Sequence, residues 1–307
     1  MNLERLQADE HVFSGIMRSR LLSAGMHMSD FRWLKEMGLP CERLQTHKIL
    51  NKALIESMKR YDDQVSIEFG LKHSPLAPWL LSISREKYLS YLTNESQPYK
   101  MPAVCSSLQK VWRLCPECIE EDCSEHGFSY WHTSHQHIGV QVCAKHHCLL
   151  HTHDELFKAD FRLPQQWKDT STPIQIEYEW QYLWQPFMLQ LSAALEEDVT
   201  LPERLRREVF DYFGVSGNLL YRERGSFDEA LKVMEAELGE SFFKHMIACF
   251  ELECKQKTNP IWVVLYDYDV MQSRARHPIY MLMVLFWLRD KLPSLGWIDY
   301  EWRIRLS

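Results

Sequence analysis

Residues 113–150 read RLCPECIEEDCSEHGFSYWHTSHQHIGVQVCAKHHCLL and carry metal-binding residue types at a regular spacing. The pattern is C-x2-C-x24-C-x2-H, and its four ligand positions are Cys115, Cys118, Cys143 and His146. A C-x2-C turn directs two thiolates at one point, and a second pair on a returning segment completes a tetrahedron around zinc. The spacing therefore predicts one structural zinc ion, closed to water and substrate, as the only cofactor. The alternative is a cysteine-rich loop that holds no metal.

A second set of metal-binding residue types interleaves with the first. It has the pattern C-x2-H twice, at Cys123 with His126 and at Cys148 with His151. Such a set could bind a second zinc ion, although cysteines and histidines also gather by chance beside a true site. The sequence leaves this second site open.

Three histidines lie between the two ligand pairs, at His132, His135 and His137. On a strand, His135 and His137 would share one face. They could then serve a zinc hydrolase, which needs only three protein ligands and a bound water. We favour the interpretation that they are hydrogen-bonding neighbours of the zinc ligands.

The same stretch resembles the zinc-finger signature of the TniQ family, which includes TnsD. The shared motifs are Cys115-Pro116-Glu117-Cys118, Tyr130-Trp131, His135-Gln136, Gly139-Val140-Gln141-Val142-Cys143 and Lys145-His146. Ala144, His147 and His137-Ile138 depart from the family pattern, but none of them removes a ligand. Near the N-terminus, Asp9-Glu10, Phe13-Ser14 and Arg18 are similar to the family's opening D-E-S-L-x-S-W-L-x-R segment.

The resemblance implies a non-enzymatic adaptor that selects the target of a transposon. Such an adaptor links a target-recognition complex, for example an RNA-guided Cascade effector, or target DNA to the AAA+ regulator TnsC. We expect the N-terminal helices around Phe13, Arg18 and Phe31 to contact that ATPase, and a homodimer is compatible with the sequence. Long TnsD-type relatives continue beyond the element that resembles Arg274 to Leu288, so the resemblance implies a short member or a core of a longer protein.

Composition narrows the functional classes. The chain has 307 residues, a net charge of −7 and nine cysteines. We find no apolar run of the roughly 18 residues that span a bilayer and no signal peptide. Reduced, metal-binding cysteines and a cytoplasmic location are therefore expected. The resemblance further implies a bacterial protein that is nucleoid-associated during transposition. The sequence has no G-x-x-x-x-G-K-[ST] P-loop, G-x-S-x-G or H-E-x-x-H motif, so no enzyme class is indicated.

Apolar periodicity predicts a mainly α fold, with helical bundle subdomains organised around the zinc-finger module. The expected domains are residues 1–104, 105–155 and 156–307. Within them we predict two helices over 8–38 and further helices over 46–100, interrupted at His73-Ser-Pro-Leu-Ala-Pro78, where two prolines forbid helix. Trp79, Leu80 and Leu81 should anchor that turn in the core.

The C-terminal region is predicted to be helical after a polar connection over 154–180. Capping boxes are expected at Thr200-Leu-Pro-Glu203 and Ser226-Phe-Asp-Glu229. Pro278 should begin a buried helix over 279–288. Residues 200–255 offer the alternative function, an autonomous sequence-specific DNA-binding protein with a helix-turn-helix and nearby arginines. The net charge of −7 argues against tight stand-alone DNA binding.

Overall fold

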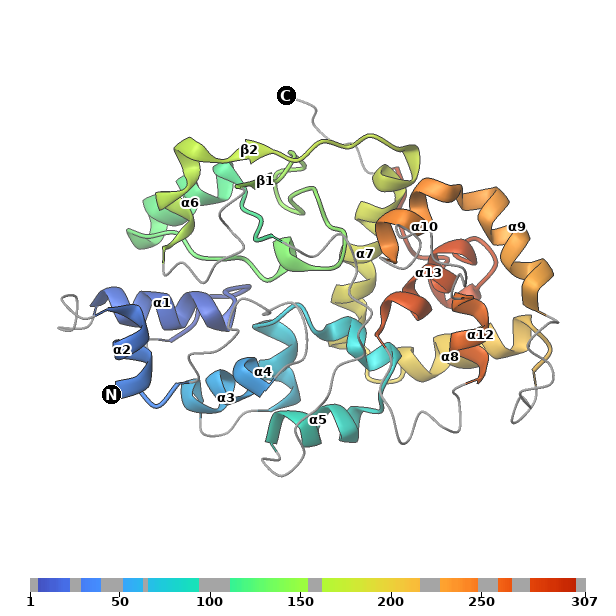
Figure 1. The fold of residues 1–307 in the computed structure, drawn as a ribbon, viewed down its shortest axis with the longest axis horizontal. Helices are drawn as coiled ribbons and strands as arrows, with labels where there is room; N and C mark the ends of the chain where they lie inside the picture. Colours follow the sequence, from blue (N-terminus) through green and yellow to red (C-terminus); the bar gives the residue numbers. More distant parts are fainter. Residues whose placement is uncertain are drawn as a thin grey trace.

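The computed structural model describes residues 5–22, 29–39, 52–62, 66–93, 111–153, 162–215, 227–247, 259–266 and 277–301. Its fold is mainly helical, as predicted (Figure 1). None of its helices has the length and apolar character that crossing a bilayer requires, within these described ranges.

The N-terminal region is a group of short helices on one side of the molecule (Figure 1). They are α1 (Val12–Leu22), α2 (Asp30–Glu36), α3 (Lys52–Tyr61), α4 (Ile67–Lys72) and α5 (Arg85–Thr93). Their starts follow ordinary capping chemistry, since Ser29 and Ser66 each accept a hydrogen bond from the amide three residues later. Helix α1 packs against α3, and α5 packs against both α3 and α4.

The predicted interruption at residues 73–78 is confirmed. Helix α4 ends at Lys72, and a short 3-10 helix follows over Ala77–Leu81. Trp79, Leu80 and Leu81 are each at most 2% exposed, so the turn is anchored in the core as expected.

We call residues 111–153 the Cys/His module. It contains helix α6 (Pro116–His126), a 3-10 turn over Ser134–Gln136 and strand β1 (His151–Thr152). Strand β1 pairs antiparallel with β2 (Thr172–Pro173) in a two-stranded sheet. The connection that precedes β2 was expected to be polar. Two of its residues, Leu163 and Trp167, are instead buried in an apolar cluster.

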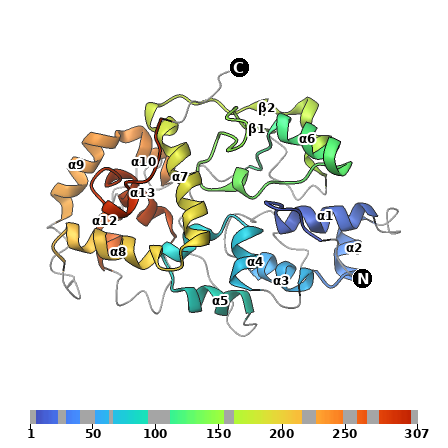
Figure 2. The ribbon, with the colours of Figure 1, turned by 180° about the vertical axis from the view of Figure 1, so that it is seen from behind.

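The C-terminal region is a second helical group that surrounds one apolar helix. It comprises α7 (Glu179–Glu197), α8 (Leu201–Tyr212), α9 (Asp228–Leu238), α10 (Glu240–Met246), α12 (Pro260–Tyr266) and α13 (Ile279–Trp287). Every residue of α13 is buried, and Pro278 lies directly before its first turn, as predicted. Figure 2 shows the long helix α7 between this group and the rest of the molecule. Aromatic rings join the two, with Trp184 of α7 5.0 Å from Phe286 of α13 between ring centroids.

The capping box predicted at Thr200 is wrong in its chemistry, although the helix does begin there. The Thr200 side chain does not cap α8. Its hydroxyl and its amide both donate to the Asp198 carboxylate instead, at 2.7 and 2.8 Å. The second predicted capping box begins at Ser226, which lies outside the described residues. Residues 216–226, in the middle of the proposed helix-turn-helix, also lie outside them.

Candidate metal centre

Two short turns of matching geometry present the four predicted ligands. Cys115 caps α6, Pro116 occupies its first turn, and the Cys118 amide donates to the Cys115 sulfur at 3.5 Å. In the second turn the His146 amide donates to the Cys143 sulfur at 3.4 Å. Proline suits the first helical position because its missing N–H has no partner there in any case. Each C-x2-[CH] spacing therefore folds into a turn that points both side chains the same way.

The ligand atoms of Cys115, Cys118, Cys143 and His146 all lie within 4.8 Å of one another. The Nδ1 atom of His146 is 3.5, 3.3 and 3.6 Å from the sulfurs of Cys115, Cys118 and Cys143 respectively. A tetrahedron with metal–sulfur bonds of about 2.3 Å and a metal–nitrogen bond of about 2.0 Å separates neighbouring ligand atoms by roughly 3.5–3.8 Å. The arrangement fits one tetrahedral metal ion, and it brings together all four predicted ligands.

The cluster is closed to solvent. Its four residues are between 1% and 8% exposed. Hydrogen bonds with Cys115 and Cys118 hold the pKa of Cys143 well below its usual range, which favours the thiolate that a metal ion binds. The Nε2 atom of His146 lies 3.0 Å from a carboxylate oxygen of Glu121, the arrangement that fixes the orientation of a metal-binding imidazole. A buried four-ligand set of this kind stabilises structure and leaves no position for catalysis.

The three histidines between the ligand pairs do not lie on a strand, because Ser134–Gln136 forms a 3-10 turn. The rings of His132 and His135 lie close together, 4.8 Å apart between centroids. The Nε2 atom of His135 lies 3.9 Å from the Cys118 sulfur and so contacts a ligand. His137 is buried, and burial lowers its pKa to about 4, so the ring is neutral. Among the described residues, His132 and His135 group with Cys118 as the only other set of three that could hold a metal ion.

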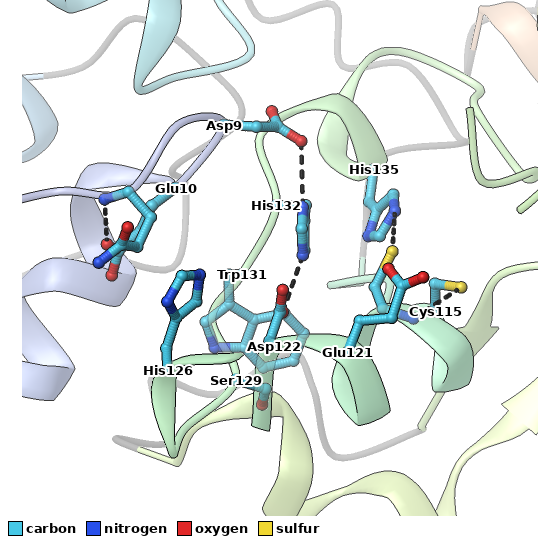
Figure 3. Close-up of polar contacts among 12 residues, drawn as sticks. Asp9, Glu10, Cys115, Glu121, Asp122, His126, Ser129, Trp131, His132 and His135 are labelled. Carbon is cyan, nitrogen blue, oxygen red and sulfur yellow. Dashed lines mark hydrogen bonds and ion pairs between the residues drawn. The ribbon is translucent and has the colours of Figure 1, made fainter. Parts of the chain in front are cut away.

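His132 joins the Cys/His module to the N-terminal segment, as Figure 3 shows. Its Nδ1 atom is 3.2 Å from Asp9 and its Nε2 atom is 2.9 Å from Asp122. Burial lowers the pKa of His132, but the hydrogen bonds to Asp122 and Asp9 outweigh burial and raise it to about 10. Both ring nitrogens of His132 are thus engaged by carboxylates, and Cys118 already belongs to the four-ligand cluster, so Cys118, His132 and His135 do not form an independent second metal site.

The N-terminal segment is bound tightly to the Cys/His module. The His11 amide donates to the Trp131 carbonyl at 2.8 Å, and the Trp131 amide donates to the Ser14 hydroxyl at 3.0 Å. Behind them, Arg18 forms a buried ion pair with Glu10 at 2.8 Å. Of the residues that resemble the family's opening segment, Glu10, Phe13, Ser14 and Arg18 are therefore interior, and Asp9 is half-buried.

This placement corrects our expectation for the ATPase contact. Phe13 and Arg18 are 1% and 5% exposed, so neither is available to a partner. Phe31 lies in α2, and its side chain is outside the described residues. Our expectation assumed that the N-terminal segment is the part of the chain least committed to the metal centre, and its hydrogen bonds with Trp131 contradict that assumption.

Helix α7 holds the module from the other side, and sequence reasoning missed this contact. Gln185 accepts a hydrogen bond from the Gln141 amide at 2.6 Å and donates to the Gly139 carbonyl at 3.3 Å. The Trp184 indole donates to the Ile138 carbonyl at 2.8 Å. Two glutamines four residues apart in an otherwise apolar helix, Gln181 and Gln185, were the available signal.

The second zinc site is not assembled among the described residues. His151 contacts the hydroxyl of Ser171 at 3.3 Å, and His126 stacks beside Phe128. Cys148 instead lies 3.5 Å from Cys115, sulfur to sulfur, at the edge of the first cluster.

One family model matches the part of the chain that contains the candidate metal centre. Residues 5–150 match the TniQ family model. A search of the curated proteins finds no match. The matched range runs from the N-terminal segment to the residues just after the metal ligands, the same span that the hydrogen bonds above tie together. Residues 5–150 therefore form a TniQ family domain.

Proposed function

We propose that this protein is a target-selection adaptor of transposition that holds one structural zinc ion. The observation that carries the proposal is the TniQ domain over residues 5–150, which encloses a buried Cys3His cluster. A TniQ domain indicates a transposon-associated role in target selection or DNA binding.

Zinc is the metal that this donor set favours. Three thiolates and one imidazole at tetrahedral spacing are typical of structural zinc, whereas magnesium and calcium prefer oxygen ligands. Elemental analysis of the purified protein should give about one zinc per chain. Full zinc content in a Cys118→Ser variant would contradict the assignment.

The partner in this proposal is an AAA+ ATPase of the TnsC type. The sequence has no P-loop of its own, so any coupling to ATP hydrolysis would belong to such a partner. A Cascade effector complex or target DNA would bring the adaptor to its site. Deleting residues 1–20 would not isolate an ATPase contact, because Phe13 and Arg18 are part of the core.

The test is co-purification with a TnsC-type ATPase in the presence of a non-hydrolysable ATP analogue. We expect the intact protein to retain the ATPase and to increase its assembly on DNA. Cys123→Ser is the matched control for Cys118→Ser, because Cys123 is half-buried on the same helix, α6, and lies outside the ligand cluster. Failure of the intact, zinc-loaded protein to bind the ATPase under any nucleotide condition would refute the adaptor function.

Autonomous DNA binding is the alternative, and two of the arginines of α8 give it little support. Arg206 donates to the backbone carbonyls of Leu81 and Ile83 at 3.0 and 3.2 Å, so it serves internal packing. Arg204 pairs with Asp198 at 3.0 Å. Non-specific affinity for DNA depends on free basic groups that neutralise phosphates. Submicromolar binding of unrelated duplex at about 150 mM salt, tighter than is typical of non-specific binding, would favour this alternative.

A further inference from the structure

Cys148 places a fifth thiol beside the metal centre. Its sulfur lies 3.5 Å from the sulfur of Cys115, although Cys148 is not one of the four mutually close ligands. The backbone fixes this position, since the Cys143 amide donates to the Cys148 carbonyl at 2.9 Å. Cys148 is only half-buried, whereas Cys115 is 1% exposed. A solvent-accessible thiol therefore stands between the solvent and a buried ligand.

We propose that Cys148 and Cys115 form an oxidative modification site, at which disulfide formation releases the bound metal. The proposal rests on the zinc site proposed above. The oxidant is a peroxide, a two-electron acceptor. The Cys148 thiolate attacks one peroxide oxygen, the O–O bond breaks, and hydroxide leaves as Cys148 becomes a sulfenic acid.

The second step consumes a zinc ligand. The Cys115 thiolate attacks the sulfur of that sulfenic acid, the S–S bond forms and a second hydroxide leaves, which takes up a proton to give water. A disulfide sulfur lies about 2.05 Å from its partner, so side-chain rotation must close the remaining gap from 3.5 Å. Cys115 is then no longer a thiolate, and the metal keeps only three protein ligands.

Exposure and coordination decide the order of these steps. The half-buried Cys148 meets the oxidant first, because Cys115, Cys118 and Cys143 are buried and, when zinc is bound, engaged with the metal. The Cys115 sulfur lies 3.5 Å from that of Cys148, so Cys115 is the thiolate that resolves the sulfenic acid. The loss of one of four ligands should weaken zinc binding strongly.

The experiment treats zinc-loaded protein with a small excess of hydrogen peroxide and follows released zinc with a chromogenic chelator. We expect the wild type to release about one zinc per chain, and peptide mapping to find Cys115 joined to Cys148. A thiol reductant with added zinc should restore the original metal content. Cys148→Ser should release zinc at least tenfold more slowly, while Cys123→Ser should match the wild type.

Each other outcome overturns the proposal. It fails if Cys148→Ser releases zinc at the wild-type rate, or if the disulfide joins another pair. It also fails if untreated Cys148→Ser is folded but cannot hold zinc, because Cys148 would then be a ligand. Should that variant not fold, alkylation of the native wild type supplies the measurement: iodoacetamide should modify Cys148 first, and the alkylated protein should then retain zinc under peroxide. The proposed zinc site is judged separately, by the zinc content before any oxidant is added.

Discussion

The buried ion pair between Arg18 and Glu10 is expected to contribute much of the stability of the N-terminal segment. Two nitrogens of the guanidinium bind the two carboxylate oxygens, at 3.2 and 2.8 Å. The side chains are 6% and 0% exposed. The guanidinium also donates to the Arg5 carbonyl at 2.8 Å and lies over the Phe128 ring, 4.7 Å from its centroid. One side chain thus links the chain start, α1 and the Cys/His module.

Arg18→Ala should destabilise the protein by about 3–5 kcal/mol, because it leaves the Glu10 carboxylate buried without its counter-ion. The only hydrogen bond that the Glu10 carboxylate would then retain among those described is from the Gln7 amide, at 2.8 Å. A domain of ordinary stability has about 5–15 kcal/mol in total, so the loss would be a large fraction. Urea unfolding followed by tryptophan fluorescence measures it.

Arg32→Ala is the matched control for this measurement. Arg32 pairs with Glu36 at 3.0 Å, but these side chains are 71% and 50% exposed, and solvent screens their attraction. Its loss should cost at most about 0.5 kcal/mol. Equal effects of the two arginine substitutions would refute our account of the N-terminal segment as part of the core. A double change of Arg18→Met with Glu10→Leu should cost less than Arg18→Ala, since it leaves no buried charge unpaired.

Three further predictions follow from the same contacts. Cys118→Ser should lose the bound metal and most soluble protein, while Cys123→Ser keeps both, as elemental analysis will show. Gln185→Met should cost about 1–3 kcal/mol in urea unfolding, because the Gln141 amide is left buried without its acceptor. Burial raises the pKa of Glu196 to about 7. A carboxyl group whose pKa is raised in the folded state stabilises the fold at pH values below its unfolded-state pKa, and it loses that contribution as the pH rises through about 7. Glu196→Gln should therefore raise the urea midpoint of unfolding more at pH 8 than at pH 5. An equal shift at both pH values would contradict this assignment.

The metal ligands and most helices could be predicted from sequence because their determinants are local. Cys115 and Cys118 face the same way owing to one turn of chain, and Ser29 caps a helix through an amide three residues away. The break at residues 73–78 follows from proline geometry alone. Spacing along the chain was sufficient in each of these cases.

The contacts that could not be predicted from the sequence join residues that are far apart along the chain. His132 and Asp9 are 123 positions apart, and Gln185 and Gly139 are 46 apart. The opening segment was expected to be available to a partner, but Glu10 and Arg18 are buried in it as an ion pair. Such pairings become apparent only when the segments are placed side by side. The segment of the three histidines is likewise set by a distant contact, because the bonds from Ser134 to Asp9 hold it in a turn.

The arrangement of these contacts suggests why one family model spans both the helical N-terminus and the metal ligands. Asp122 lies on α6, the helix whose first turn presents Cys115 and Cys118. His132 connects that helix to Asp9, so a metal ion that fixes α6 also fixes the acceptor for the N-terminal segment. On its other side the module presents backbone at Gly139 and Gln141 to α7. The metal centre therefore lies between two helical groups that each depend on its backbone for hydrogen bonds, and metal binding should stabilise their relative placement as well as the module itself.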